Sequence, residues 1–237
     1  YVTTFALHLL GEHESELKQA SNARQFYPNS SEFLSFEVRA LCAMGREDEI
    51  WRRLDESRKL SGSGGTGGLL VMCSSELQRH GYTEAAQKAI AKAIDWYAAR
   101  PDSEQQLPTS QSALAGAYYA AGRYADARAI YKVLLQKSPD NIDYQGYFAT
   151  ISARTGDNAE ARRIDAILKN MNRPYIFGRH TYWRARIAAL LGQKDDAVIL
   201  LRDAFGQGVG YQRVHADIDF ESLWDYPPLK ELVKPRD

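Results

Sequence analysis

Glycine recurs at a nearly constant interval along this chain. The six positions are Gly11, Gly45, Gly81, Gly122, Gly156 and Gly192, and the intervals between them are 34, 36, 41, 34 and 36 residues. A period of this length, with a helical pattern on each side of the glycine, is typical of stacked helix-turn-helix hairpins. We therefore predict an all-α fold, a right-handed superhelical solenoid of about six such hairpins with a short C-terminal capping segment.

A small residue follows the glycine at a fixed distance in the later repeats. Five residues after the glycine stand Ala86, Ala127, Ala161 and Ala197. Two helices are expected to cross closely at this position, where a larger side chain would clash. The first two repeats carry Glu16 and Ile50 instead, so the pattern is weaker there.

The repeat register divides the chain into six hairpins within a single predicted domain spanning residues 1–237. The predicted limits are 1–29, 30–65, 66–108, 109–140, 141–176 and 177–210, followed by a cap at 211–237. The longest interval contains Pro101 and Pro108, which predict a lengthened helix, a loop, and a new helix capped by Thr109 or Ser110. The glycine-rich segment at 61–68 predicts a flexible connector.

Composition narrows the classes of partner. Thirty basic residues balance thirty acidic ones, so the chain lacks the positive field expected of a nucleic-acid-binding protein. No apolar run approaches the length of a membrane span, and we expect a cytoplasmic location. Cys42 and Cys73 are expected to be free, buried thiols. The chain begins at Tyr1 without an initiator methionine, which suggests a segment of a longer protein, and its oligomeric state stays open.

Motifs for catalysis are not visible. The glycine-rich segment lacks the lysine of a phosphate-binding loop, and the five histidines show no metal-binding spacing. A Gly-x-Ser-x-Gly turn for a nucleophilic serine is also missing from the sequence. We therefore predict a protein that is not an enzyme and has neither a metal nor a cofactor.

The fourth repeat resembles a tetratricopeptide repeat. The positions that carry the resemblance are Leu114, Tyr118, Tyr119, Gly122, Tyr124, Ala127, Tyr131, Leu134 and Pro139. One position departs from the family, because Ala115 stands where a glycine is frequent. The resemblance implies a module that binds a protein or peptide along the concave wall formed by the first helices.

The C-terminal region resembles the ends of repeat regions in multidomain bacterial signalling proteins, which include eukaryotic-like serine/threonine kinases and transcriptional regulators. The shared positions are Asp217, Phe220, Leu223, Pro227 and Leu232. This resemblance implies a regulatory or scaffolding role within a larger signalling protein. Independently, we expect an apolar set to cover the exposed end of the last hairpin: Phe220, Leu223, Trp224, Leu229 and Leu232.

The tetratricopeptide register places six arginine and tyrosine residues at or near the concave wall: Arg39, Arg79, Tyr119, Arg154, Tyr182 and Arg186. Both residue types are frequent in binding hot spots, and the arginine fork suits carboxylates. We predict an acidic or carboxylate-bearing peptide as the partner. Two alternatives stay open: each arginine faces solvent or pairs with a neighbouring acid, or the groove binds a small ligand as a sensory domain.

An aromatic cluster beside the sixth hairpin has two interpretations. Tyr175, Phe177, Tyr182 and Trp183 either form a recognition patch or pack the preceding loop against this hairpin. Because aromatic residues at helical spacing are more often core than site, packing is the favoured interpretation.

Overall fold

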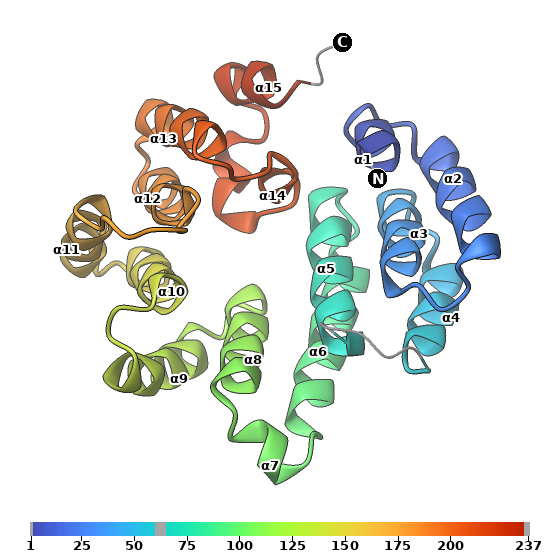
Figure 1. The fold of residues 1–237 in the computed structure, drawn as a ribbon, viewed down its shortest axis with the longest axis horizontal. Helices are drawn as coiled ribbons and strands as arrows, with labels where there is room; N and C mark the ends of the chain where they lie inside the picture. Colours follow the sequence, from blue (N-terminus) through green and yellow to red (C-terminus); the bar gives the residue numbers. More distant parts are fainter. Residues whose placement is uncertain (1, 60–64, 235–237) are drawn as a thin grey trace. The chain divides into compact units, whose positions relative to one another are not determined.

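The computed structural model describes residues 2–59 and 65–234, and these residues form helices and turns without a β-strand. They divide into two compact units, one ending at Gln105 (unit 1) and one running from Gln106 to Lys234 (unit 2). Figure 1 shows the helices of both units. The predicted all-α fold is confirmed, whereas the right-handed superhelix and the single-domain assignment stay predictions.

Unit 1 is a stack of helical hairpins. Its described helices are α1 (Val2–Leu9), α2 (His13–Phe26), α3 (Ser31–Ala43), α4 (Glu47–Ser57), α5 (Gly65–Arg79), α6 (Thr83–Ala98) and α7 (Asp102–Gln105). The pairs α1–α2, α3–α4 and α5–α6 are the hairpins, and α3 packs against both α2 and α5. Consecutive hairpins therefore share a continuous core in this unit.

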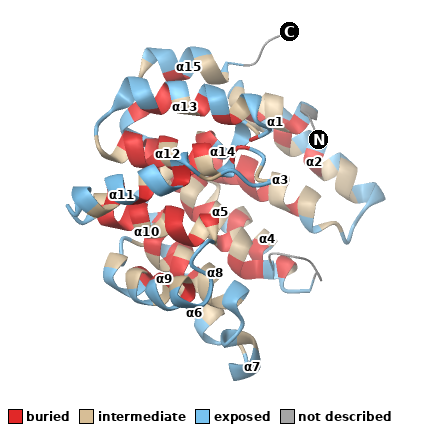
Figure 2. Ribbon diagram, turned by 60° about the vertical axis from the view of Figure 1, so that its left-hand side comes forward, coloured by how far each residue is buried: buried red, intermediate tan, exposed pale blue. Residues whose placement is uncertain are grey.

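Unit 2 repeats the arrangement and ends in shorter elements. Its described elements are α8 (Pro108–Ala120), α9 (Tyr124–Lys137), α10 (Ile142–Arg154), α11 (Asn158–Lys169), α12 (Arg179–Leu190), α13 (Lys194–Gly206), α14 (Gln212–His215), the 3₁₀-helix η1 (Ile218–Leu223) and α15 (Pro227–Val233). Within this unit, α8, α10 and α12 form an inner row, and α9, α11 and α13 form an outer row (Figure 1). Helices α10 and α12 are largely buried, as their red segments show (Figure 2).

Each recurring glycine stands at the turn of a hairpin in the described chain. Their φ angles are positive, from 66° at Gly45 to 84° at Gly156, a region that glycine enters without steric cost. At Gly122 the turn is closed by two hydrogen bonds, from Gly122 N to the Tyr119 carbonyl at 3.0 Å and from Arg123 N to the Tyr118 carbonyl at 2.9 Å. These bonds satisfy carbonyls at the end of α8, so the glycine ends one helix and allows the next to begin.

The alanine positions are buried as expected. Ala127, Ala161 and Ala197 are fully inaccessible, and Ala86 is 3% exposed. The first two repeats use larger or charged residues at this position, and Ile50 and Glu16 are also fully buried there. A small side chain is therefore one of several solutions to the same helix crossing.

Two local predictions about connections are wrong. Helix α8 begins with Pro108 at its first turn after Leu107, so neither Thr109 nor Ser110 is its N-cap. Proline is well suited to this place because its missing N–H has no partner in the first turn. In the predicted connector, residues 61–64 lie outside the described residues, whereas Gly65–Gly68 form the first turn of α5. Gly67 is required there because a Cβ would overlap the ring of Trp96.

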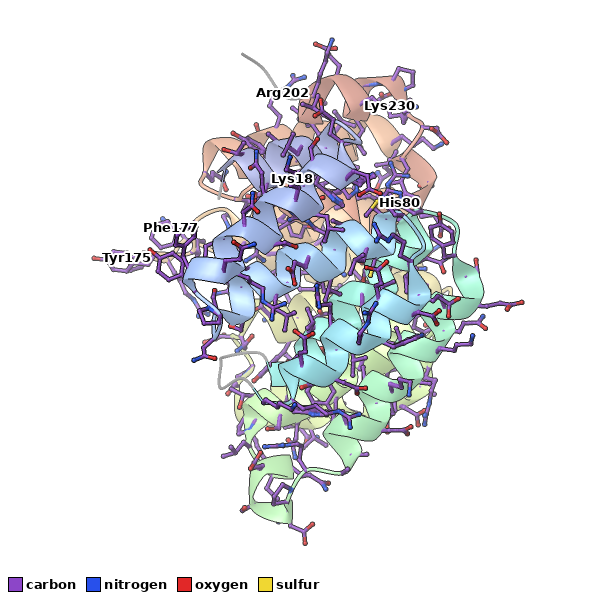
Figure 3. All side chains as sticks on the ribbon, turned by 90° about the vertical axis from the view of Figure 1, so that its right-hand side faces the viewer. Lys18, His80, Tyr175, Phe177, Arg202 and Lys230 are labelled. Atoms are coloured by element: carbon purple, nitrogen blue, oxygen red, sulfur yellow. The ribbon has the colours of Figure 1, made fainter. Side chains whose placement is uncertain are left out.

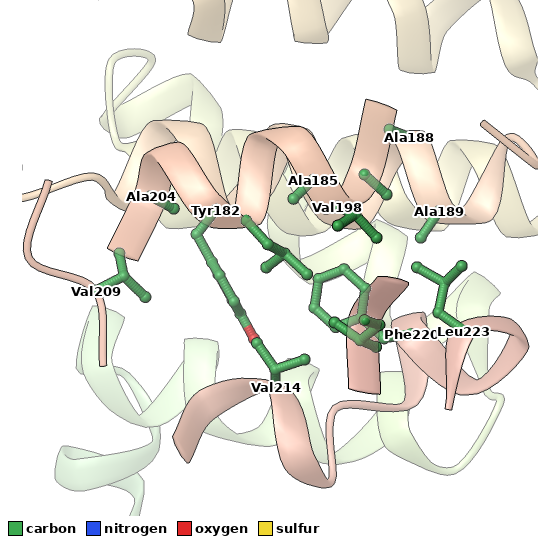
Figure 4. Close-up of a cluster of buried hydrophobic side chains, with 13 residues drawn as sticks. Tyr182, Ala185, Ala188, Ala189, Val198, Ala204, Val209, Val214, Phe220 and Leu223 are labelled. Carbon is green, nitrogen blue, oxygen red and sulfur yellow. The ribbon is translucent and has the colours of Figure 1, made fainter. Parts of the chain in front are cut away.

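The C-terminal segment covers the last hairpin as expected. Phe220 and Leu223 are buried in a cluster with residues of α12 and α13 (Figure 4). Leu229 belongs to the same cluster, and Trp224 and Leu232 pack against it. None of the described helices combines the length and the apolar character needed to cross a membrane. The two cysteines are free and buried, with their Sγ atoms 3.2 Å apart.

The aromatic residues before and in α12 divide into two pairs. Tyr182 and Trp183 are buried, whereas Tyr175 and Phe177 are 83% and 62% exposed and project from the unit (Figure 3). Packing therefore accounts for Tyr182 and Trp183 only.

Candidate functional site

Four of the predicted site residues converge on the inner row of unit 2. Tyr119 comes from the end of α8, Arg154 from the end of α10, and Tyr182 and Arg186 from α12. They contact Asp219 of η1 and Asp217, the residue directly before η1. We call the four residues the arginine–tyrosine wall. Successive first helices thus present their side chains to one short acidic segment.

Asp219 is the centre of this contact. The Tyr119 hydroxyl donates to its Oδ1 at 2.5 Å, and Arg154 Nη2 donates to the same oxygen at 2.6 Å. Arg186 Nε donates to Oδ2 at 2.7 Å. The Asp219 side chain is fully buried. Both oxygens of a buried carboxylate are therefore satisfied by charged or hydroxyl donors from three helices, as a buried charge requires.

Asp217 makes the second contact and shapes the segment. Its Oδ2 lies 2.7 Å from the Tyr182 hydroxyl and 3.3 Å from Arg186 Nε. Its Oδ1 accepts a hydrogen bond from Asp219 N at 3.0 Å, which caps η1. One aspartate thus fixes the backbone turn that aims the other at the arginines.

Aromatic rings pack against Arg186 of the arginine–tyrosine wall. The Arg186 guanidinium lies 4.0 Å from the centre of the Trp183 ring and 5.4 Å from that of Tyr147. The Trp183 indole N–H donates to Asp143 Oδ1 at 3.0 Å. Arginine is well suited to this arrangement because it stacks on rings through its face while its edge donates to carboxylates.

The charges shift the pKa values of the groups. Burial alone would raise the pKa of Asp219, but the Arg186 and Arg154 guanidinium groups outweigh it and lower this pKa below its usual value. Burial raises the pKa of Asp217, because Arg186 only partly offsets the desolvation of the carboxylate. Burial, followed by the Asp219 charge, raises the pKa of Tyr119 well above its usual value. Asp219 therefore remains the ionised partner that the arginines hold.

The other two predicted site residues belong to unit 1. Arg39 of α3 is buried and donates from Nε to Glu16 Oε1 at 2.7 Å, with its guanidinium 4.8 Å from the Phe5 ring centre. Arg79 is the last residue of α5, next to His80. These two arginines border a group of histidines and glutamates, not the arginine–tyrosine wall.

Burial and charge pairing have opposite effects on the pKa values of the histidines in that part of unit 1. Burial would lower the pKa of His8, but its pairing with Glu16 and Glu76 outweighs burial and raises the pKa. Burial lowers the pKa of His80 to about 4. The pKa values of His8 and His80 are therefore shifted in opposite directions.

Sequence reasoning missed the acidic half of the contact in unit 2. Asp217 was identified only as a family position, and Asp219 was not singled out. Tyr147 and Trp183 were not recognised as the support of Arg186. The available signal was the occurrence of two aspartates, at 217 and 219, in the segment after the last hairpin.

Two pockets in the described part of the chain lie away from the arginine–tyrosine wall. One has a volume of about 630 Å³ and is lined in unit 1 by Trp51, Trp96, Lys88 and Lys92 among others. The second, about 360 Å³, lies in unit 2 beside Arg162, Asp165 and Arg184. Neither provides the closed pocket at Tyr182 and Arg186 that a small ligand in the predicted groove would need.

Comparison with known proteins identifies similarity to one family. A family model described as tetratricopeptide repeat matches residues 118–169. A solved tetratricopeptide repeat protein from Parabacteroides merdae ATCC 43184 is 15% identical, with a TM-score of 0.43, over 94% of this chain and 95% of that chain. No match was found among curated proteins.

Proposed function

We propose, on the premise that residues 118–169 match the tetratricopeptide-repeat model, that the chain is a non-catalytic module that binds a carboxylate-bearing segment of a protein partner. Tetratricopeptide repeats generally mediate protein–protein interaction or scaffolding. The proposed binding surface is the arginine–tyrosine wall of unit 2. A role within a larger bacterial signalling protein, and a cytoplasmic location, stay predictions.

One observation supports this surface above others: it already holds two aspartates of a segment that is not part of a hairpin. Arg154 and Arg186 both contact Asp219 at 2.6 to 2.7 Å. Arg154 Nη2 also donates to the Ile218 carbonyl at 3.1 Å, so the wall engages backbone as well as side chain. Recognition of both is what binding of an extended acidic peptide requires.

The segment from the same chain would compete with any external peptide. A tethered ligand has an effective concentration in the millimolar range, so a free peptide of equal affinity is largely excluded. We therefore propose that partner binding requires displacement of Asp217 and Asp219. Weakening the internal contact should then expose the surface without altering the wall.

The test uses the full chain with Asp217→Asn and Asp219→Asn and a fluorescent peptide corresponding to residues 214–226. Each lost charge-assisted contact weakens binding of the internal segment to the wall by about 1.5–3 kcal/mol. This loss lowers the equilibrium constant for internal binding by at least about tenfold. We expect the variant to bind the peptide at least about tenfold more tightly than the unsubstituted chain, measured by fluorescence anisotropy. Adding Arg154→Gln should abolish this gain.

Two controls distinguish recognition from nonspecific attraction. A peptide with asparagine at both aspartate positions should not bind, because it lacks the charges that the wall engages. Arg128 of α9 pairs with Asp157 outside the wall, so Arg128→Gln should leave peptide affinity unchanged. Equal binding of the two peptides, or binding that survives Arg154→Gln, would refute the proposed surface.

A further inference from the structure

Unit 1 contains a group of metal-ligating side chains that the hairpin turns bring together. The group consists of His8 from α1, His13 and Glu16 from α2, Glu76 from α5, and His80 directly after α5. Figure 3 labels His80 at the end of that helix. His8 and Glu16 side chains are fully buried, Glu76 is 7% exposed and His80 23%. Residues far apart in sequence thus meet in one place with limited access to solvent.

Three of these side chains bring their ligand atoms close together. His8 Nε2 lies 3.2 Å from Glu76 Oε2, and His80 Nε2 lies 3.9 Å from the same oxygen. All three atoms lie within 4.8 Å of one another. Donors bound at about 2.0–2.2 Å in a tetrahedron are separated by about 3.3–3.6 Å. The His8–Glu76 separation of 3.2 Å is close to this range, and the His80–Glu76 separation of 3.9 Å is slightly longer.

The remaining side chains support this set. Glu16 Oε2 lies 2.7 Å from His8 Nδ1, so a proton held on Nδ1 leaves Nε2 of the neutral imidazole as the nitrogen that can bind an ion. Glu16 Oε1 in turn accepts from Arg39 Nε at 2.7 Å. A carboxylate that holds the second nitrogen of a ligating histidine is a regular feature of zinc sites.

A second arrangement of the same residues is less suitable. His8, His13 and Glu16 also place ligand atoms within 4.8 Å. However, Glu16 already uses one oxygen for Arg39 and the other for His8 Nδ1. Glu16 Oε2 also lies 3.7 Å from His13 Nδ1. Glu16 is therefore better suited to orient His8 than to bind an ion.

We propose that His8 Nε2, Glu76 and His80 Nε2 bind a zinc ion in unit 1, with Glu16 and Arg39 as positioning residues. Two imidazoles and one carboxylate form a donor set that suits zinc among the divalent ions. The ion would join α1 to the end of α5 and so stabilise the N-terminal hairpins by binding the folded state. This site is independent of the arginine–tyrosine wall and of the proposed partner.

The test is isothermal titration calorimetry of zinc chloride into the full chain after removal of metal with a chelator. We expect one zinc ion per chain with a submicromolar Kd and a higher melting temperature in the presence of zinc. Cobalt should give visible absorption bands of a four- or five-coordinate ion. His80→Ala and Glu76→Gln should each weaken zinc binding by at least about 100-fold, and Glu16→Gln by about 10–100-fold.

Matched controls address other donors. His180→Ala removes a histidine outside the group. Cys73→Ala removes one of the two buried thiols, whose Sγ atoms lie 3.2 Å apart. Both variants should keep the zinc affinity within about twofold if the three ligands are correct. Circular dichroism without zinc verifies that each variant is folded. His80 is the preferred ligand to substitute, because it is the most exposed of the three. Failure to bind one equivalent at micromolar zinc, or unchanged affinity in folded His80→Ala, would overturn the site.

Discussion

At the scale of single residues, the support beneath Arg186 depends on a glycine in the facing helix. A Cβ at Gly146 of α10 would overlap the Trp183 ring, whose face carries the Arg186 guanidinium. Gly146→Ala should therefore displace Trp183 and destabilise unit 2 by about 1–3 kcal/mol. Thermal unfolding followed by tryptophan fluorescence measures both effects.

Gly116 provides the matched control for this substitution. It also lies within a helix of unit 2, but a Cβ there would meet the Tyr147 hydroxyl at 3.6 Å, an ordinary contact. Gly116→Ala should be neutral or stabilise by up to about 1 kcal/mol, because alanine loses less backbone entropy in a helix. If the two variants melted alike, the close packing of Trp183 on Gly146 would be wrong.

The same scale shows where sequence reasoning about the site reached its limit. Register and residue type placed Arg154 and Arg186 at or near the concave wall and predicted a carboxylate-bearing peptide as the partner. The acceptor, Asp219, lies 65 residues from Arg154 and 100 from Tyr119. No periodic signal joins such positions, because the contact depends on how the C-terminal segment turns back across the inner row. The alternative in which each arginine pairs with a neighbouring acid did not name this distant aspartate.

At the scale of helices, the hairpin core depends on the small residue five positions after the turn glycine. Ala127 of α9 is fully inaccessible and packs in a cluster with Tyr119 and Tyr131. Ala127→Arg would place a charge and a long side chain there, which should destabilise unit 2 by at least about 3 kcal/mol. Ala129→Arg, at an exposed position of the same helix, should change stability by less than about 0.5 kcal/mol. Equal melting temperatures would contradict the repeat register.

Helices were predictable where a local rule determines them and not elsewhere. The turn glycines located the hairpins because their positive φ is a backbone requirement that few other residues meet. The start of α8 was misplaced because two rules competed, and proline at the first turn outweighed the capping preference of Thr109. The helical state of Gly67 was also missed, since it follows from contact with Trp96 and not from the intrinsic preference of glycine.

At the scale of the whole molecule, the division into two compact units after Gln105 predicts that the two units unfold independently of the peptide bond between them. Each unit buries apolar residues of its own, such as Leu34 and Leu77 in unit 1 and Tyr131 and Phe220 in unit 2. In repeat arrays, stability is the sum of hairpin and neighbour terms, so a chain break between compact units should be tolerated. The sequence pattern alone predicted one domain, because the glycine interval continues through both units.

A specific protease site inserted between Gln105 and Gln106 tests this statement. The flanking residues Gln105, Gln106 and Leu107 are exposed, so the site should be cleaved in the folded protein. We expect the nicked chain to keep its helical circular dichroism and to melt within a few degrees of the intact chain. The same insertion after Gly122 should abolish the melting transition of unit 2 on cleavage, because it separates α8 from α9 within the cluster of Ala115 and Tyr131. If cleavage after Gln105 instead unfolded the entire chain, the 237 residues would behave as one cooperative domain.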